Sequence, residues 1–351
     1  MHGHAYDSEA CPGYVQYGNI KIHCWKRTGH GTLGLKESIK RSCNCYFMKI
    51  ANELGSKKML NSFQLLGLGQ KTGIELPSEA AGFIPGNRYW RQQLRPGASV
   101  TPSITGMMSI GQSDSGASPL QLAAMVGAIA NRGQYYKPRI VKRVIHPHQG
   151  VVVQNRPNLK VNLLQEGLKA EHLERIRKGM WMAANEPGGT AGRAAVKDRG
   201  VSAKTGTAQT TDMGTKSNDA WTVAFAPYER PRYVVVVAVK RGTSGGAVAG
   251  PLVHLIMRGL FARDEGLKLP LAKMKEYNGD FIVRAKVELP DQGDLLDVAY
   301  EDIGETGNEI ENVLTAPAVP EIVRPRLPKP TIRQEADAEG STAPKAIIIE
   351  E

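Results

Sequence analysis

The sequence predicts an α+β fold, because helical patterns fill its first part and strand patterns follow them. Strands are expected at 200–209, 220–227 and 233–240, which are rich in Val, Thr, Ala and Trp and are bounded by turn residues. The second and third are joined by a loop of hairpin length, 228–232, so we expect an antiparallel sheet.

Helices are predicted from apolar periodicity and from capping residues. We expect them at 35–41, 46–54, 56–66, 119–131, 170–185 and 250–261. Ser56 and Ser118 are the expected N-caps of the third and fourth, and Pro119 takes the first helical position of the fourth. Four residues of the last helix are expected to face the sheet: Leu252, Leu255, Ile256 and Leu260.

Two segments lack a regular pattern. Residues 67–115 are rich in Gly, Pro and Ser, so we expect long irregular connections there. After residue 262 the periodicity decays, and the end of the chain is acidic and spaced by prolines. We therefore predict a partial domain over 1–262 and a C-terminal extension over 263–351 that is mostly disordered from about residue 290.

The formal net charge of +11 is unevenly distributed, with +19 in residues 1–261 and −8 in residues 262–351. The chain has no basic stripe interleaved with aromatic residues, so we predict no nucleic-acid partner. An anionic polymer or an anionic membrane surface would suit the basic part of the chain as a partner equally well. No apolar run approaches the roughly 18 residues of a membrane span, and the first residues lack a signal-peptide pattern.

All four cysteines lie near the start of the chain, at Cys11, Cys24, Cys43 and Cys45. The Cys-x-Cys pair has the wrong spacing for a zinc knuckle and no second ligand pair follows it, so we predict no metal and no cofactor. Cys11 and Cys24 close a short loop that suits a disulfide in an oxidising compartment. Four free thiols are the alternative.

Lys204-Thr205-Gly206-Thr207 lies within the first predicted strand. Glycine weakens a strand interior and often marks the close approach of a ligand or another backbone. Thr205 and Thr207 should share one face, because side chains alternate along a strand, and Lys204 adds a positive charge nearby. The pattern suits carboxylate binding along the strand, and an edge strand with a solvated lysine is the alternative.

Ser42-Cys43-Asn44 lies at the break between the first two predicted helices. Taken alone, this serine would be an ordinary N-cap. Ser-x-Asn followed by a distant Lys-Thr-Gly, however, matches two of the three motifs of penicillin-binding proteins and class A β-lactamases, whose first motif is Ser-x-x-Lys.

The sequence resembles the transpeptidase domain of penicillin-binding proteins over about residues 10–261. Beyond the two motifs, the resemblance rests on Trp25, on the Gly-His-Gly run at 29–31, and on the segments TGIELPSE (72–79), SIGQ (109–112), PLQLA (119–123) and DAW (219–221). It is most similar to class B enzymes of the cell-elongation type, ahead of division-type and class A enzymes.

The resemblance implies a penicillin-binding, serine β-lactamase-like fold and a D,D-transpeptidase that cross-links peptidoglycan through a serine acyl-enzyme. Stem peptides ending in D-Ala-D-Ala, β-lactams and other cell-wall synthesis proteins are the implied partners, at the extracytoplasmic face of the inner membrane. Ser42 is implied to relay protons, Asn44 to hold the substrate amide, and Lys204 to orient Ser42. The implied substrate-binding residues complete the strand motif: Thr205, Gly206 and Thr207, whose backbone N–H would enter the oxyanion hole.

The chain departs from the family pattern in three places. No serine is followed three residues later by lysine; the nearest match, Ser38 to Arg41, ends in arginine, which does not deprotonate in proteins. We therefore predict an incomplete fold without its N-terminal strands, Ser-x-x-Lys helix and membrane anchor, and a chain that is inactive alone. The second departure is the cysteine in the middle of the Ser-x-Asn motif, Cys43, whose side chain is expected to point outward. The third is Ser113, which replaces a glycine of the family.

Two other functions are open at this stage. A non-catalytic β-lactam-sensing or scaffold module would keep the substrate-binding strand without turnover. A serine β-lactamase is the other alternative, against which the Pro-rich insertions and the TGIELPSE segment speak.

Overall fold

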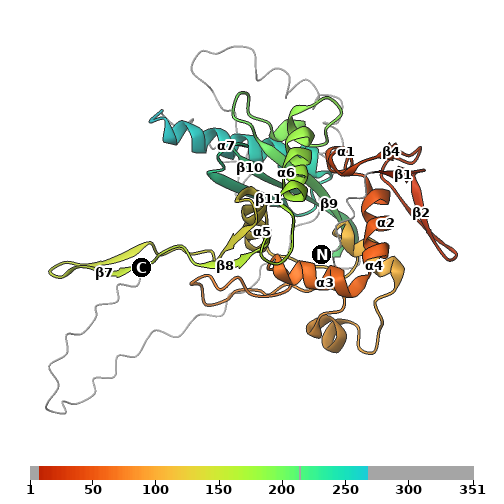
Figure 1. The fold of residues 1–351 in the computed structure, drawn as a ribbon, viewed down its shortest axis with the longest axis horizontal. Helices are drawn as coiled ribbons and strands as arrows, with labels where there is room; N and C mark the ends of the chain where they lie inside the picture. Colours follow the sequence, from red (N-terminus) through yellow and green to blue (C-terminus); the bar gives the residue numbers. More distant parts are fainter. Residues whose placement is uncertain (1–7, 213–214, 268–351) are drawn as a thin grey trace, which may run out of the picture. The chain divides into compact units, whose positions relative to one another are not determined.

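A three-stranded antiparallel sheet, in the order β11–β10–β9, lies at the centre of the fold (Figure 1). Its strands are β9 (Ser202–Asp212), β10 (Thr215–Ala226) and β11 (Tyr233–Val239). The structure, a computed structural model, describes residues 8–212 and 215–267. The predicted α+β class, the three strands and their antiparallel order are confirmed, although β9 and β10 extend further toward their shared turn than expected.

The helices largely follow the predicted segments. In chain order they are α1 (Leu35–Lys40), α2 (Asn44–Leu54), α3 (Ser56–Leu65), α4 (Pro102–Ser109), α5 (Pro119–Ala130), α6 (Ala170–Asn185) and α7 (Gly250–Asp264), with short turns η1 (Trp90–Leu94), η2 (Gly192–Ala194) and η3 (Gly245–Ala249). Ser118 caps α5 in a capping box, as expected. The N-cap of α3 is Gly55, so the prediction of Ser56 was wrong by one position.

Eight short strands form four two-stranded pairs outside the central sheet. These are β1 (Glu9–Cys11) with β4 (Gly31–Leu33), β2 (Tyr14–Tyr17) with β3 (Ile20–His23), β5 (Gln134–Tyr136) with β8 (Leu159–Asn162), and β6 (Arg143–His146) with β7 (Gly150–Gln154). The sequence analysis missed all of them, because strands of three to five residues leave too little alternation to recognise.

Helices cover both faces of the central sheet. On one face, α7 packs its buried Val253 and Met257 against Ala224. On the other face, α5 packs Val126 against Phe225. Side chains alternate along β10, so these two neighbours in the sequence belong to opposite layers.

The predicted buried face of α7 was right for Leu260, which packs against the core, and wrong for Leu252 and Ile256. Leu252 and Ile256 are 39% and 44% exposed, whereas Val253, Met257 and Phe261 are buried. Almost every side of this helix carries an aliphatic residue, so periodicity alone does not single out the face that meets the sheet.

Residues 67–115 are less irregular than expected. α4 lies within them and begins at two ordinary start signals: the Thr101 side chain accepts a hydrogen bond from the Ile104 N–H, and Pro102 takes the first turn. The π-helical turn η1 precedes it, with Trp90 fully buried. The prediction of irregular connections was therefore wrong for this part of the segment.

Two earlier predictions concern the C-terminal part of the chain. The predicted disorder from about residue 290 lies outside the described residues. Among the described helices, the continuous stretch 245–264 is long and apolar enough to cross a membrane by length and composition, which the sequence analysis did not anticipate. One side of its α7 part is packed into the core of the domain.

Candidate active site

Ser42 occupies a tight turn between α1 and α2. Its φ of 51° is left-handed, a conformation that non-glycine residues rarely adopt and that is held here by the surroundings. The Trp25 indole N–H reaches both carbonyl oxygens of this turn, those of Arg41 and Ser42, at 3.0 Å each. Trp25 therefore buttresses the backbone that presents the Ser42 hydroxyl, a role that the sequence analysis did not assign.

Lys204 reaches Ser42 across 162 positions of sequence. Its Nζ donates to the Ser42 Oγ at 2.7 Å and to the Thr205 carbonyl oxygen at 2.7 Å. Burial lowers the pKa of Lys204 from 10.5 to about 8. An amine with this pKa gains and loses a proton more readily near neutral pH than an exposed lysine does, and its hydrogen bond gives that proton a path to a hydroxyl.

β9 separates its motif residues between two faces. In the register with β10, Lys204 pairs with Val223 while Thr205 pairs with Thr222, so Lys204 points toward the α5 side and Thr205 toward the α7 side. Thr207 shares the face of Thr205, as expected, and its Oγ1 accepts from the Gly245 N–H at 3.2 Å. β9 is an edge strand, so its outer edge has no neighbouring strand among the described residues.

Gly245 allows η3 to lie directly on the strand pair. A Cβ at this position would stand 2.3 Å from the Gly206 carbonyl oxygen and 2.4 Å from that of Trp221. Both obstacles are backbone atoms, which cannot rotate away. The middle of the Lys-Thr-Gly strand is therefore backed by main chain instead of by side chains.

The structure does not bring every predicted residue to one point. The Asn44 Nδ2 lies 3.4 Å from the His23 carbonyl oxygen, at the start of α2, and so is engaged with the β2–β3 hairpin. Ser42 and Lys204 are in direct contact, and Thr205 and Thr207 line the opposite face of β9.

The SIGQ segment supplies a contact that the sequence analysis missed. The Gln112 Nε2 donates to the Thr207 carbonyl oxygen at 3.0 Å, so this loop lies against the end of the Lys-Thr-Gly-Thr motif. The next residue, Ser113, has a φ of 69°. This left-handed conformation favours glycine, which explains why a glycine suits the position in the family.

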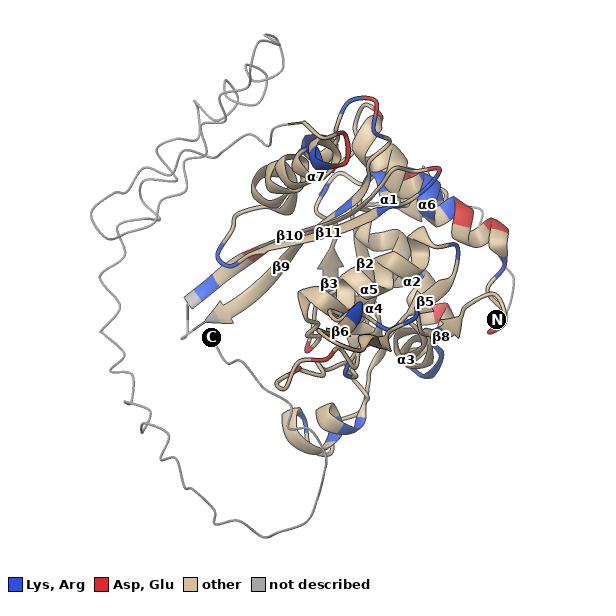
Figure 2. Cartoon of the chain, turned by 90° about the vertical axis from the view of Figure 1, so that its left-hand side faces the viewer, with Lys and Arg blue, Asp and Glu red and all other residues tan. Residues whose placement is uncertain are grey.

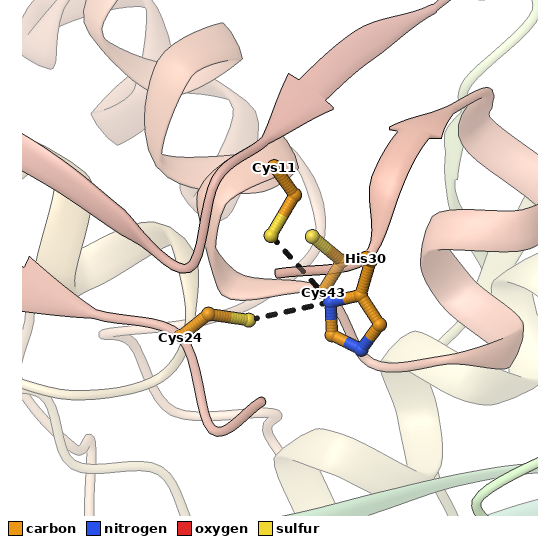
Figure 3. Close-up of side chains that lie close together, drawn as sticks. All are labelled: Cys11, Cys24, His30 and Cys43. Carbon is orange, nitrogen blue, oxygen red and sulfur yellow. Dashed lines mark hydrogen bonds between the residues drawn. The ribbon is translucent and has the colours of Figure 1, made fainter. Parts of the chain in front are cut away.

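A cluster of thiols and one imidazole lies next to Ser42 (Figure 3). The ligand atoms of Cys11, Cys24, His30 and Cys43 all lie within 4.8 Å of one another. The cysteine side chains are buried and are free thiols, which is the second of the two alternatives considered for Cys11 and Cys24. Cys43 is completely buried, so the prediction that it points outward was wrong.

Two sulfur–nitrogen distances in this cluster match those of a tetrahedral metal centre. The Cys11 and Cys24 sulfurs are each 3.5 Å from the His30 Nδ1. Zinc bonds of about 2.3 Å to sulfur and about 2.0 Å to nitrogen, at a tetrahedral angle, place such atoms about 3.6 Å apart. The His30 Nε2 is buried without a hydrogen-bond partner within the described part of the chain.

Cys45 lies beside this cluster and completes its thiol contacts. Hydrogen bonds from the Cys43 and Cys45 thiols hold the pKa of Cys24 well below its ordinary value. The same bonds, together with burial, raise the pKa values of Cys43 and Cys45. Cysteine spacing alone does not indicate His30 as a ligand, although His30 lies in the Gly-His-Gly run at 29–31.

Known proteins are similar to this chain in sequence and in fold. Residues 4–258 match the family described as "Penicillin binding protein transpeptidase domain". The chain belongs to this family. It is 32% identical over 252 residues to "Peptidoglycan D,D-transpeptidase MrdA" of Acinetobacter baumannii, and 34% identical over 254 residues to "Stage V sporulation protein D" of Bacillus subtilis. These matches cover 68% and 70% of this chain but only 36% and 37% of the relatives, so the chain spans well under half of their length.

Solved structures of penicillin-binding proteins have the same fold. Pseudomonas aeruginosa PBP2, in complex with WCK 5153, is similar with a TM-score of 0.63 and 30% identity, over 76% of this chain and 57% of that one. PBP2 of Helicobacter pylori, in a complex with MreC, gives a TM-score of 0.63 and 28% identity, over 76% of this chain and 46% of that one. The predicted family and its cell-elongation type are confirmed by these matches.

Proposed function

We propose that this chain is the part of a peptidoglycan D,D-transpeptidase that carries the substrate-binding strand and the proton-relay serine. The observation that carries the proposal is the 2.7 Å contact between the Lys204 Nζ and the Ser42 Oγ, since it joins two motifs from distant parts of the sequence. The substrates would be stem peptides ending in D-Ala-D-Ala, with β-lactams as their mimics.

The edge of β9, which has no neighbouring strand among the described residues, is suited to a peptide substrate. An extended peptide can pair with a free strand edge through main-chain hydrogen bonds. Thr205, Gly206 and Thr207 would bind the terminal carboxylate of the substrate, and the positive charge of Lys204 favours an anion nearby. The Thr207 N–H would donate to the oxyanion that forms during acyl transfer. Asn44 would hold the substrate amide after releasing its bond to the His23 carbonyl oxygen.

Acyl transfer also requires a serine nucleophile with an adjacent base, and the sequence contains no Ser-x-x-Lys. We therefore assign activity to this chain only together with a polypeptide segment that carries that motif. Ser42 and Lys204 would then exchange protons with the nucleophile and the leaving amine. A sensing or scaffold module would use the same strand without this step.

Labelling with a fluorescent penicillin tests this assignment. The purified chain should give no covalent adduct in intact-mass analysis, because it lacks the nucleophile. Co-expression with the Ser-x-x-Lys segment of the Acinetobacter baumannii relative should restore a stable adduct. A folded complex that never labels would favour the scaffold reading, and rapid release of the label would favour a serine β-lactamase.

By analogy with its relatives, we place the enzyme at the extracytoplasmic face of the inner membrane, with other cell-wall synthesis proteins as partners. The H. pylori complex of PBP2 with MreC supports a partner of this kind. The division into a domain over 1–262 and an extension over 263–351 stays a prediction.

The cysteine cluster favours a second role, and here we propose a structural zinc site in place of the predicted absence of metal. Cys11, Cys24, Cys43 and His30 would supply the three-sulfur, one-nitrogen ligand set of structural zinc, and the two sulfur–nitrogen distances of 3.5 Å fit it. The ion would tie β1 and the end of β3 to the start of α2. Because Cys43 follows Ser42 directly, the bound ion would hold the backbone of the serine turn in place.

Metal analysis of the purified chain tests this second role. We expect one zinc per chain, and loss of the metal in Cys24→Ser. Cys45→Ser is the matched control, since this neighbouring thiol lies outside the four-residue set and its removal should leave the metal in place. Zinc absent from the wild-type chain after growth and refolding in zinc would refute the site.

A further inference from the structure

The β6–β7 ribbon (residues 139–160) projects away from the central sheet and its helices (Figure 1). Large aliphatic side chains are exposed along it at Ile140, Val141, Val144, Ile145, Val151, Val152, Val153 and Leu159. An isolated two-stranded ribbon is only marginally stable in water. Contiguous exposed aliphatic residues are uncommon on a surface that faces only solvent, and they are typical of a contact surface.

Both faces of the ribbon are apolar. Val144 pairs with Val153 across the strands, and Ile145 pairs with Val151. Cross-strand partners share a face and successive residues alternate, so the two pairs lie on opposite faces. A β-bulge between Val144 and Ile145 accommodates Val152 and allows this arrangement. A ribbon lying flat on a neighbouring domain would need only one such face.

The ribbon is also strongly cationic. Residues 139–160 contain five Lys or Arg and no Asp or Glu. Lys142, Arg143 and Arg156 are exposed, and in Figure 2, where the ribbon points toward the viewer, the backbone beside the β6 label is coloured as basic. By alternation, Lys142 shares the face of Val144 and Arg143 that of Ile145. Each face therefore presents a cation next to an aliphatic pair.

The charge, the tip and the edges of the ribbon decide which kind of partner it can bind. Two copies of a ribbon with this charge repel each other, which disfavours self-association through it. The tip of the ribbon, Pro147 to Gln149, carries no large aliphatic residue to insert into a lipid layer. The outer edges of β6 and β7 are unpaired among the described strands, and such edges accept an added strand.

We propose that the β6–β7 ribbon binds an extended segment of a partner protein that carries acidic and β-branched side chains on each face. The segment would add to an open edge through main-chain hydrogen bonds. Its carboxylates would meet Lys142 and Arg143, and its aliphatic residues would cover the paired valines and isoleucine. This inference does not depend on the proposed transpeptidase or zinc sites.

Binding of a synthetic probe to the whole 351-residue chain tests the proposal. The probe is a fluorescent peptide of the repeat Glu-Glu-Val-Val, which places Glu and Val alternately on both faces of a strand. We expect saturable binding that weakens with salt and is at least tenfold weaker for the Lys-Lys-Val-Val and Glu-Glu-Ser-Ser repeats. A probe with alternate backbone amides methylated should also lose binding, because it cannot pair with the edge.

Variants of the chain locate the binding site. Lys142→Glu/Arg143→Glu and Val144→Thr/Val153→Thr should each reduce affinity about tenfold or more. The matched controls make the same changes on other exposed surfaces: Lys57→Glu/Lys58→Glu on α3 and Ile20→Thr on β3. Equal loss in the controls, undiminished binding of the methylated probe, or binding to phosphatidylglycerol vesicles but not to the peptide would overturn the proposal.

Discussion

Replacing Lys204 by methionine tests whether the lysine that contacts Ser42 is a buried, readily deprotonated amine. Methionine keeps the length and the apolar stem of the side chain but removes the titrating group. Burial lowers the pKa of Lys204 from 10.5 to about 8, and this shift is a statement about stability as well as about reactivity. The expected result is a difference in the pH dependence of unfolding.

The sign and size of this difference follow from proton binding. Below about pH 8 the amine is charged in both states, and the folded state carries the full penalty of burying the charge. Between about pH 8 and 10.5 the unfolded chain binds more protons, so the free energy of unfolding rises with pH through this window. Lowering the pKa from 10.5 to about 8 corresponds to roughly 3 kcal/mol of stability, since a tenfold change in proton affinity is about 1.36 kcal/mol.

Urea unfolding of both proteins between pH 7 and 11 measures the effect. The wild-type chain should gain about 3 kcal/mol relative to Lys204→Met across this range, because other titrating groups contribute equally to both. Lys57→Met, at an exposed lysine of α3, is the control and should run parallel to wild type. Parallel curves for Lys204→Met and wild type would refute the burial argument.

Three further predictions follow from the site. Gly245→Ala should destabilise the chain by about 1–3 kcal/mol in urea unfolding, because its Cβ would meet two backbone oxygens, whereas Gly259→Ala in α7 has open space and should stabilise it by up to about 1 kcal/mol. Trp25→Phe should lower stability by about 1 kcal/mol in the same measurement, since it removes the indole N–H that donates to the serine turn; an unchanged midpoint would show that these bonds are not formed in solution. In the complex restored with a Ser-x-x-Lys segment, Lys204→Ala should slow penicillin acylation about 10²–10³-fold, and Thr205→Val should cost less, about 1.5–3 kcal/mol; equal labelling of all three proteins would contradict the assigned roles.

The sequence predicted those parts of the structure that rest on local signals. α6 begins and ends where its apolar periodicity does, and α5 begins at its Ser-Pro start signal. Local signals did not identify the buried side of α7, because an aliphatic residue is available on several faces and the sheet selects Val253 and Met257 by position. The contact between Ser42 and Lys204 was expected only from the family resemblance, because hydrophobic periodicity carries no information about residues so far apart in the sequence.

The cysteine cluster was beyond the reach of spacing rules for a related reason. Its ligands come from β1, from the end of β3, from the loop before β4 and from the start of α2, and each segment supplies a single ligand. Zinc motifs are recognised from pairs of ligands close in sequence, so four single ligands give no such signal. The sequence contains the four residues of the cluster, but it does not show that they lie close together in the fold.

Trp25 gives this domain a spectroscopic property of its own. Its side chain is 58% exposed, whereas Trp90 is buried and the other two tryptophans are mostly buried. The indole contacts the serine turn through its N–H, and its ring meets the edge of His30 at a centroid distance of 5.2 Å. A small soluble quencher should therefore reduce the fluorescence of Trp25 more than that of the other tryptophans. The quenchable part of the fluorescence would then report metal uptake and movement of the serine turn without an attached dye.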